Sequence, residues 1–362
     1  MSLLGELIAE GLVEKQGRGK SEGGRKPDLY GLRDNSLYVL SIAMGRFKTK
    51  MAIFDNNHNN ITGIQTFPIR ISEDLTAVDK LQENATALIA DSGIDTGKLM
   101  GVGISMPGLV DSSEGNNHTY MRTNSPSESL QDLLRRKLGK PVFIQNDVKS
   151  IALAEHRFGL AQGKKDVLVL SLDWGVGMGM IMNGKLCTGI TGFAGEIGHI
   201  PFENDGILCY CGKRGCLETV ASGIALANMA KEGIRSGQHS LLNELADFEL
   251  DSIEPQLVVD AANRGDQYAI NILAKVGMNL GKAIATLIQL FNPELILLGG
   301  RVAEAKQYIT TPIQQAIYTY SMAQLREKTE IALSTLGKDA GILGSVAVVM
   351  ENIFEDRLES ES

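Results

Sequence analysis

The segment from Gly195 to Glu218, GEIGHIPFENDGILCYCGKRGCLE, constrains the fold of this chain more than any other. It places four metal-binding side chains in the order His-x9-Cys-x-Cys-x4-Cys, which are His199, Cys209, Cys211 and Cys216. One imidazole and three thiolates are typical of a tetrahedral structural zinc site. Ordinary buried cysteines beside a loop histidine are the alternative, and disulfides fit less well because three clustered cysteines leave one unpaired. We therefore predict a bound structural Zn²⁺.

Two glutamates in this segment are not needed by a metal. Glu196 lies three residues before His199, and Glu218 lies two residues after Cys216. GEIGH followed by CxCGxxGCLE resembles the signature of the ROK family, which comprises repressors, uncharacterised reading frames and sugar kinases. The resemblance implies that Glu196, His199 and Glu218 hydrogen-bond sugar hydroxyls, and that His199 serves both the metal and the sugar.

Composition is typical of a cytoplasmic globular protein. The 362 residues are enough for two or three domains, and 43% of them are hydrophobic. No uninterrupted apolar run approaches the roughly 18 residues of a membrane span, and the acidic start MSLLGELIAE is unlike a secretory signal. The net charge of −8 argues against a surface that coats nucleic acid but leaves room for a small basic module.

Such a basic module lies at the front of the chain. Residues 3–13 have apolar side chains at helical spacing, and Gly11 is expected to end that helix. Between Lys15 and Lys26 the sequence is glycine-rich and carries five Lys or Arg against one Glu. A solvated linker is one interpretation, but xLIxxGLVxxxGxGxSxGGRKPxxYxL resembles the end of the winged helix-turn-helix of ROK repressors. The resemblance implies a DNA-contacting wing with the basic residues Arg18, Lys20, Arg25 and Lys26.

The recognition element of such a domain is only partly contained in this sequence. In a complete winged helix-turn-helix, two helices and the start of the recognition helix precede this segment, and most base contacts come from that start. The chain begins ten residues before Gly11. Either the natural start lies further upstream, or the chain has been trimmed, or DNA binding has been lost. The chain as written is expected to bind DNA weakly and with little sequence preference.

From about residue 36 the pattern is α/β. Strands are expected at LYVLSIAM, TKMAIFD, ITGIQTFPI, LMGVGISM, VFIQND, VLVLSL and ELILLGG, with helices at 75–89, 149–158, 279–293 and 340–354. The family resemblance implies an actin-like ATPase (ribonuclease H-like) fold of two lobes. We expect a partial winged-helix module at 1–34, a small lobe at 35–145 with the helix 341–356 packing back on it, and a large lobe at 146–340 that carries the zinc loop 195–218.

Asn146 and Asp147 follow a predicted strand and precede a predicted helix, where an Asn-Asp pair often caps the helix. The flanking PVFIQND and ALAE also resemble the ENDANAAALGE motif of the family. That resemblance implies that both residues contact sugar, and that Asp147 is the catalytic base if the chain is a kinase. Asn124 occupies a position where the family often has a sugar-contacting asparagine.

The nucleotide side departs from the kinases of the family. Their first phosphate loop reads D-x-G-G-T, whereas residues 43–47 read AMGRF; their second reads G-T-G-I-G-A-G, whereas residues 173–179 read DWGVGMG. The glycines that survive in the phosphate and adenosine loops also suit tight turns or close packing. They are Gly45, Gly175, Gly177, Gly179, Gly299 and Gly300. ATP and Mg²⁺ are therefore not expected as cofactors.

The sequence predicts a sugar-sensing transcriptional regulator that resembles ROK repressors of the xylose or N-acetylglucosamine type. Its partners would be a monosaccharide or phosphosugar effector and operator DNA, without a membrane. The family resemblance suggests a homodimer or homotetramer. The alternative is an ATP-dependent hexose or N-acetylhexosamine kinase that uses Asp147 as general base, and a third is a sugar-binding regulator that no longer contacts DNA.

Overall fold

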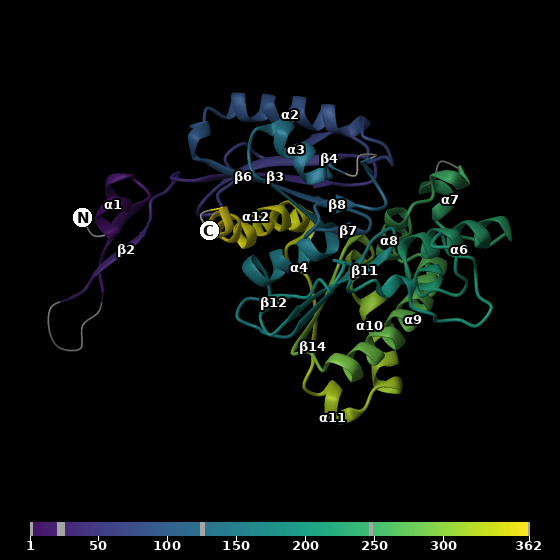
Figure 1. Ribbon diagram of the computed structural model, residues 1–362. Coiled ribbons are helices and arrows are strands. Elements are labelled where there is room, and N and C mark those ends of the chain that lie inside the picture. The colour runs from purple at the N-terminus through teal and green to yellow at the C-terminus, as the bar shows by residue number, and fades with distance from the viewer. Residues whose placement is uncertain (1–2, 20–25, 124–126, 246–248, 361–362) are drawn as a thin grey trace. The chain divides into compact units, whose positions relative to one another are not determined.

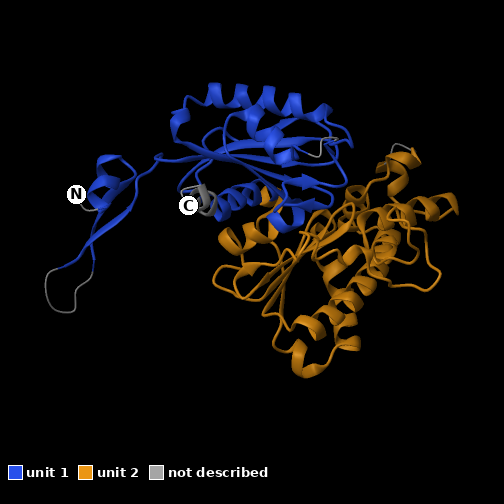
Figure 2. Cartoon of the chain, viewed as in Figure 1, with its two compact units in different colours: residues 1–150, 341–362 blue, residues 151–340 orange. Residues whose placement is uncertain are grey.

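The computed structural model describes residues 3–19, 26–123, 127–245 and 249–360, and divides into two compact units. Unit 1 comprises residues 1–150 and 341–362, and unit 2 comprises residues 151–340 (Figure 2). Unit 1 is thus assembled from the two ends of the chain. Among the described residues, no helix has the length and apolar character that crossing a membrane requires.

The N-terminal segment of unit 1 is a short helix followed by a β-hairpin. Helix α1 spans Leu3–Ala9, and strands β1 (Val13–Arg18) and β2 (Asp28–Leu32) pair antiparallel. Gly11 has a φ of 71°, a left-handed conformation that suits glycine and ends the helix as the sequence predicts. The two strands flank the basic, glycine-rich segment of the predicted wing, of which residues 20–25 lie outside the described part.

Unit 1 is built on a five-stranded sheet in the order β5-β4-β3-β6-β9 (Figure 1). β3, β6 and β9 run parallel, whereas β4 and β5 add an antiparallel meander. The strands are β3 Tyr38–Met44, β4 Thr49–Asp55, β5 Gln65–Phe67, β6 Leu99–Met106 and β9 Val142–Asn146. A small second sheet pairs β7 (Val110–Asp111) with β8 (Asn116–Asn117).

Helices cover both faces of this sheet, so β3 and β6 are apolar along almost their whole length. The helices of the unit are α2 Thr76–Ser92, α3 Leu130–Leu138, the first turn of α4 Asp147–Phe158, the 3-10 helix η1 Thr96–Lys98, and α12 Ala340–Ser360. α12 lies directly on the strands: a Cβ at Gly103 would sit 2.0 Å from the Ser345 carbonyl oxygen. Ser345 Oγ also donates to the Ile42 carbonyl at 2.8 Å.

Unit 2 repeats the same strand plan in the order β12-β11-β10-β13-β14. β10, β13 and β14 are parallel, and β11 and β12 form the antiparallel meander. The strands are β10 Val167–Leu172, β11 Val176–Met182, β12 Lys185–Leu186, β13 Leu295–Gly299 and β14 Glu330–Leu333. In both units the first strand is central, its hairpin partners lie to one side, and two later parallel strands lie to the other.

A largely apolar core joins the sheet of unit 2 to its helices, with the long helix α9 contributing residues along its length. The α-helices are α5 Glu218–Ala221, α6 Gly223–Arg235, α7 Leu242–Leu245, α8 Pro255–Asn263, α9 Gln267–Phe291, α10 Gln307–Tyr320 and α11 Ala323–Arg326. The 3-10 helices are η2 Ile197–His199, η3 Leu250–Ser252, η4 Arg301–Ala305 and η5 Gly337–Asp339.

Two predicted elements differ in the structure. Residues 173–179 were expected to form the counterpart of a phosphate loop, but Gly177 and Gly179 lie inside strand β11 and pair with Ser171 and Val169 of β10. The alternate residues Val176, Met178 and Met180 are buried, so one face of the strand enters the core while the glycines occupy the other. The strand expected over ITGIQTFPI is reduced to β5, because only three of its residues pair with β4.

Candidate functional site

The loop 195–218, here called the Cys/His loop, gathers its four predicted metal ligands in unit 2. One ligand atom from each of His199, Cys209, Cys211 and Cys216 lies within 4.8 Å of all the others. The separation is 3.6 Å between Cys209 Sγ and His199 Nδ1, and 3.6 Å between the Sγ atoms of Cys211 and Cys216. Cys209 and Cys216 are buried, whereas Cys211 faces outward.

These separations fit a tetrahedral zinc ion. Bonds of about 2.3 Å to sulfur and about 2.0 Å to nitrogen place neighbouring ligand atoms roughly 3.5–3.8 Å apart at the corners of a tetrahedron. Without a cation, burial and the neighbouring thiols raise the pKa of Cys216 to about 12, and burial also raises the pKa of Cys209. A divalent cation would reverse that effect, because it stabilises thiolates directly. The donor set therefore suits a positive ion at its centre.

Backbone pairing shapes the Cys/His loop before any metal binds. Pro201 pairs with Cys216, and Leu208 pairs with Arg214, in two isolated antiparallel bridges. Gly215 has a φ of 71°, and a Cβ at that position would lie 1.8 Å from the Glu203 carbonyl oxygen. A side chain at 215 would thus force the two arms of the loop apart.

Glu218 lies beside this cluster and is nearly buried, with 8% of its surface exposed. Its Oε2 accepts a hydrogen bond from Val176 N–H at 3.2 Å. Burial raises the pKa of the Glu218 carboxyl, the Val176 hydrogen bond and the charge of His199 lower it, and the charge of Glu196 raises it. The three residues implied in sugar recognition therefore share one electrostatic environment in unit 2.

Gly175 and Gly198 make room for the Glu218 carboxylate. A Cβ at Gly175 would lie 2.5 Å from Glu218 Oε2, and a Cβ at Gly198 would lie 2.6 Å from the Val176 carbonyl oxygen and 3.2 Å from the same carboxylate oxygen. Gly175 was predicted only as a remnant of a phosphate loop. The contact gives it a second role, since it lets the turn after β10 approach a buried carboxylate.

Tyr210 was not anticipated from the sequence. Its hydroxyl oxygen lies 3.0 Å from His199 Nε2, and the two rings meet edge to face with their centroids 5.1 Å apart. The Tyr210 side chain is 81% exposed. His199 thus directs Nδ1 toward the thiol of Cys209 and Nε2 toward the solvent-exposed phenol of Tyr210. The only signal in the sequence is the position of Tyr210 between two metal ligands.

In unit 1, Asn146 and Asp147 stand at the start of α4. Asn146 Oδ1 accepts from the backbone N–H of Val148 at 3.0 Å and of Lys149 at 3.1 Å, so Asn146 caps the helix. Its Nδ2 donates to the Gly108 carbonyl at 3.0 Å. Asp147 is half-buried, and its Oδ1 accepts from Val148 N–H at 2.9 Å. The capping role that the residue types allow is present, and sugar contact by this pair stays a prediction.

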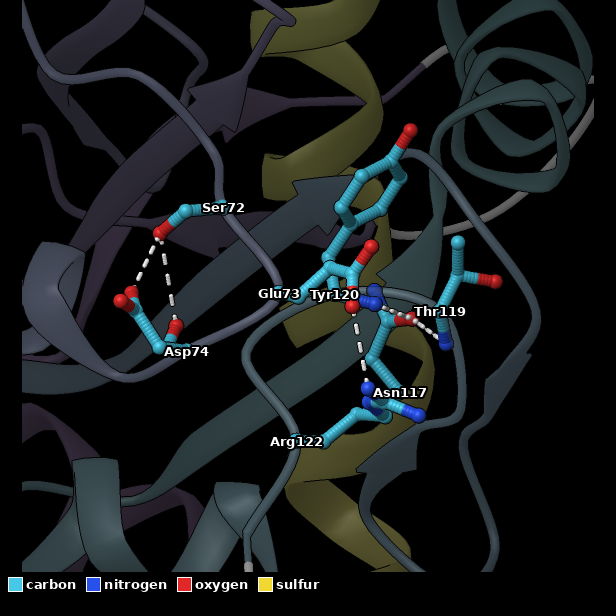
Figure 3. A network of polar contacts seen from close by, with 7 residues as sticks. All are labelled: Ser72, Glu73, Asp74, Asn117, Thr119, Tyr120 and Arg122. Carbon is cyan, nitrogen blue, oxygen red and sulfur yellow. Dashed lines mark hydrogen bonds and ion pairs between the residues drawn. The ribbon is translucent and has the colours of Figure 1, made fainter.

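A polar network fixes the segment next to that cap (Figure 3). Asn117 Oδ1 accepts from the backbone N–H groups of Thr119 and Tyr120 at 2.9 and 3.0 Å, while its Nδ2 donates to the Pro107 carbonyl at 2.9 Å. The turn at 107–108 is therefore held by Asn117 on one side and by Asn146 on the other. The segment leads toward Asn124, which lies outside the described residues.

The turns that correspond to phosphate loops carry bulky or charged side chains. Gly45 N–H donates to the Lys48 carbonyl at 2.9 Å and closes the β3–β4 turn. The guanidinium carbons of Arg46 and Arg70 lie 5.5 and 5.1 Å from the centroid of the exposed Phe47 ring. Gly299 ends β13, and Gly300 precedes η4 with a φ of 86°.

The predicted DNA-contacting residues are only partly described. Arg18 ends β1, and its Nε lies 3.6 Å from Asp28 Oδ1, which Lys15 Nζ also approaches at 2.7 Å. Lys26 is exposed just before β2. Lys20 and Arg25 lie outside the described residues. Asp28 therefore offsets part of the positive charge that the sequence places on this hairpin.

Known proteins resemble this chain along most of its length. The DNA-binding transcriptional dual regulator NagC of Escherichia coli K12 is 30% identical over 345 residues, covering 95% of this chain and 83% of the regulator. The glucokinase of Thermotoga maritima is 35% identical over 255 residues, covering 70% of this chain and 80% of the enzyme. A crystal structure of a ROK family transcriptional regulator, a homologue of the E. coli MLC protein, superposes with a TM-score of 0.83 at 27% identity and covers 97% of this chain and 87% of its own.

The match to the ROK family spans residues 39–352, which includes both five-stranded sheets and the Cys/His loop. The mixed α/β architecture, with its repeated strand order, is the actin-like ATPase fold that the resemblance implies. On this evidence the chain belongs to the ROK family.

Proposed function

We propose that this chain is a sugar-sensing transcriptional regulator that does not transfer phosphate. The observation that carries the proposal is the extent of similarity at the N-terminus. The match to the E. coli regulator takes in 345 of the 362 residues and leaves about 17 unmatched, so it must reach at least into the hairpin that ends at Leu32. The match to the glucokinase takes in 255 residues. We assign residues 1–34 to DNA binding, 35–145 with 341–356 to the small lobe, and 146–340 to the large lobe.

The turns after the central strands support the same proposal. Phosphoryl transfer requires groups that hold Mg²⁺ and neutralise the charge of the transferring phosphate. The β3–β4 turn instead presents Arg46 and an exposed Phe47, without a carboxylate for the metal. The turn after β10 begins with Asp173 and Trp174, which add a negative charge and a large ring. Sugar recognition uses none of these positions.

We assign the effector to the polar residues described above. In unit 2, Glu196, His199 and Glu218 would accept or donate hydrogen bonds to sugar hydroxyls, and in unit 1 Asn146 and Asp147 would do the same. A structural Zn²⁺ held by His199, Cys209, Cys211 and Cys216 would fix the Cys/His loop, and with it the direction of Glu218. The ligand class is a monosaccharide or phosphosugar.

Calorimetry tests the proposal directly. The full chain is titrated with glucose, xylose, N-acetylglucosamine and their phosphorylated forms, and at least one is expected to bind. Asp147→Asn should weaken that binding at least tenfold, since it removes the charge that orients a hydroxyl. Asp91→Asn, at an exposed aspartate of α2, is the matched control and should leave the affinity unchanged.

A coupled assay for ATP hydrolysis with the same sugar separates the two functions of the family. Turnover at background is the expected result. Sugar-dependent turnover that is lost in Asp147→Asn would instead establish an ATP-dependent hexose kinase, the function that the similarity to the T. maritima glucokinase favours.

A further inference from the structure

Two loops of unit 2 meet at one end of its sheet. β10 and β13 are parallel neighbours, with Ser171 opposite Gly299, so their carboxyl ends lie side by side. The turn 173–175 follows β10, and η4 follows β13 after Gly300. A Cβ at Gly300 would lie 2.5 Å from the Leu172 carbonyl oxygen. The backbones of the two loops are therefore in direct contact.

The Asp173 carboxylate joins these loops. Its Oδ1 accepts from Trp174 N–H at 2.8 Å and lies 2.6 Å from Arg301 Nη2. The Arg301 guanidinium carbon also lies 5.7 Å from the centroid of the Trp174 ring. A single carboxylate oxygen thus receives one backbone amide and one guanidinium, and the guanidinium is held further by an aromatic ring.

The same donors are those that bind phosphate oxygens in proteins. Backbone N–H groups of turns and arginine guanidinium groups both donate hydrogen bonds to anions. Here the turn is held independently of Asp173's side chain, because Gly223 N–H donates to the Asp173 carbonyl and Ile224 N–H to the Trp174 carbonyl, both at 2.9 Å. The Trp174 N–H would keep its place if the carboxylate lost its charge, and the Trp174 ring would still contact the Arg301 guanidinium.

We propose that Arg301 and the Trp174 N–H form an anion subsite, and that Asp173 is its built-in occupant. The negative charge of Asp173 does not merely repel a phosphate. It fills the subsite from within, and a tethered carboxylate competes at a much higher effective concentration than a free anion. With 41% and 34% of their side chains exposed, Asp173 and Arg301 are accessible to solvent, so an external anion reaches the subsite once the carboxylate is neutralised.

This inference rests on the proposed function, because a chain that transfers phosphate from ATP would have to leave the subsite open. The probe is inorganic tripolyphosphate, titrated calorimetrically into the full chain at low ionic strength without Mg²⁺. Asp173→Asn should bind the probe at least tenfold more tightly than the wild type. The double variant Asp173→Asn/Arg301→Ala should return to the wild-type affinity, since the guanidinium supplies the attraction.

Glu304→Gln is the matched control, because it removes one negative charge from η4, where Glu304 Oε2 accepts from Gln256 Nε2 at 3.2 Å. It should leave the affinity for tripolyphosphate unchanged. Asp173→Ser also removes the carboxylate from the subsite, and it replaces Asp173→Asn if the asparagine disturbs folding. The inference is overturned if Asp173→Asn and Asp173→Ser bind tripolyphosphate no more tightly than the wild type. It is also overturned if Glu304→Gln gains as much affinity as the Asp173 variants do. Sugar-dependent ATP turnover by the wild type would contradict the proposed function. If there is no ATP turnover and the Asp173 variants gain no affinity for tripolyphosphate, only the role of Asp173 as occupant of the subsite is contradicted.

Discussion

Cys216 is the most buried of the four predicted metal ligands in the Cys/His loop. It is 1% exposed, its thiol pKa is raised to about 12, and its backbone pairs with Pro201 across the loop. Without a cation this thiol stays protonated, so a bound metal would have to displace its proton and hold it as a thiolate. Under the proposed zinc assignment, the metal would be part of the folded state.

The first prediction is one zinc per chain, lost in Cys216→Ala. Structural zinc contributes roughly 10–16 kcal/mol to the folding of small peptides. If even about 3 kcal/mol of that is lost here, Tm should fall by roughly 6–12 °C, at 2–4 °C per kcal/mol for a unit of this size. Elemental analysis and thermal unfolding measure the two effects. Cys187→Ala, at a free cysteine outside the cluster, is the control and should keep both the metal and the Tm. Wild-type protein that is purified without metal would contradict the zinc assignment.

Glu155 is a second buried acid, on α4 within unit 2. Its carboxylate accepts from Leu160 N–H at 3.2 Å and contacts the Ser334 hydroxyl, and burial raises its pKa. A carboxyl with a raised pKa in the folded state binds its proton more tightly than the unfolded chain does. Its contribution to stability is therefore present below the ordinary pKa of about 4.3 and is lost as the pH rises through the raised pKa.

Glu155→Gln should remove this pH dependence, because an amide keeps the shape and both hydrogen bonds without a charge. The free energy of unfolding in urea is measured for the wild type and the variant at pH 5 and pH 8. The variant should gain on the wild type as the pH rises, by up to about 1.4 kcal/mol per pH unit within the window between the two pKa values. Glu254→Gln, at an exposed glutamate of the same unit, should not change the difference; a constant gap for Glu155→Gln would mean that burial does not govern this carboxyl.

At the scale of elements, the β1–β2 hairpin has less positive charge available than its sequence suggests. Asp28 lies within 4 Å of both Lys15 Nζ and Arg18 Nε, so one carboxylate offsets two cations. Exposed ion pairs of this kind contribute little to stability, but they lower the charge that a polyanion meets.

Neutralising Asp28 should therefore strengthen DNA binding. Fluorescence anisotropy with a random-sequence duplex between about 50 and 200 mM salt is the measurement. Asp28→Asn should bind more tightly at low salt, and Arg18→Ala should bind more weakly and reduce the slope of log affinity against log salt by roughly 1. Glu10→Gln makes the same charge change in the same module outside the hairpin. An equal gain from Glu10→Gln would show that only net charge matters.

The elements that the sequence predicts best are those whose pattern is local. The strands at 99–106 and 167–172, the turn at Gly11 and the spacing of His199 with the three cysteines depend on neighbouring residues, and each is present. Strand β11 was not predicted, because glycine at every second position is typical of a loop. Only the pairing with β10 shows that these residues form a strand. The Asp173–Arg301 contact joins residues 128 positions apart and depends on the parallel pairing of β10 with β13, which no local pattern indicates. The contact of Tyr210 with His199 and the contact of Gly175 with Glu218 were also missed, because each depends on how the chain folds around the Cys/His loop.

At the scale of the whole molecule, the same strand order occurs twice in one chain, and each copy has its own apolar core. The sequence shows the α/β alternation but not the duplication, because the turns in matching positions share no motif: GRF follows β3 where DWG follows β10. Unit 1 is closed by α12 from the far end of the chain, so its Ser345–Ile42 hydrogen bond spans 303 residues. Removing the C-terminal helix would expose the apolar face of β3 and β6.

A regulator must couple its two ligands through the whole molecule, and this requirement gives the last prediction. If the effector sugar weakens DNA binding by some factor, DNA must weaken sugar binding by the same factor, since the two measurements close one thermodynamic cycle. Because this chain is expected to show little sequence preference, a random-sequence duplex at low salt serves as the probe. Saturating sugar should weaken its binding by about 5- to 150-fold, the usual range of coupling between sites. Asp147→Asn should keep the DNA affinity of the sugar-free protein and lose the effect of the sugar. A sugar that binds the chain and leaves its DNA affinity unchanged would show that sugar binding and DNA binding are not coupled. The protein would then be a sugar-binding protein whose N-terminal module serves another purpose.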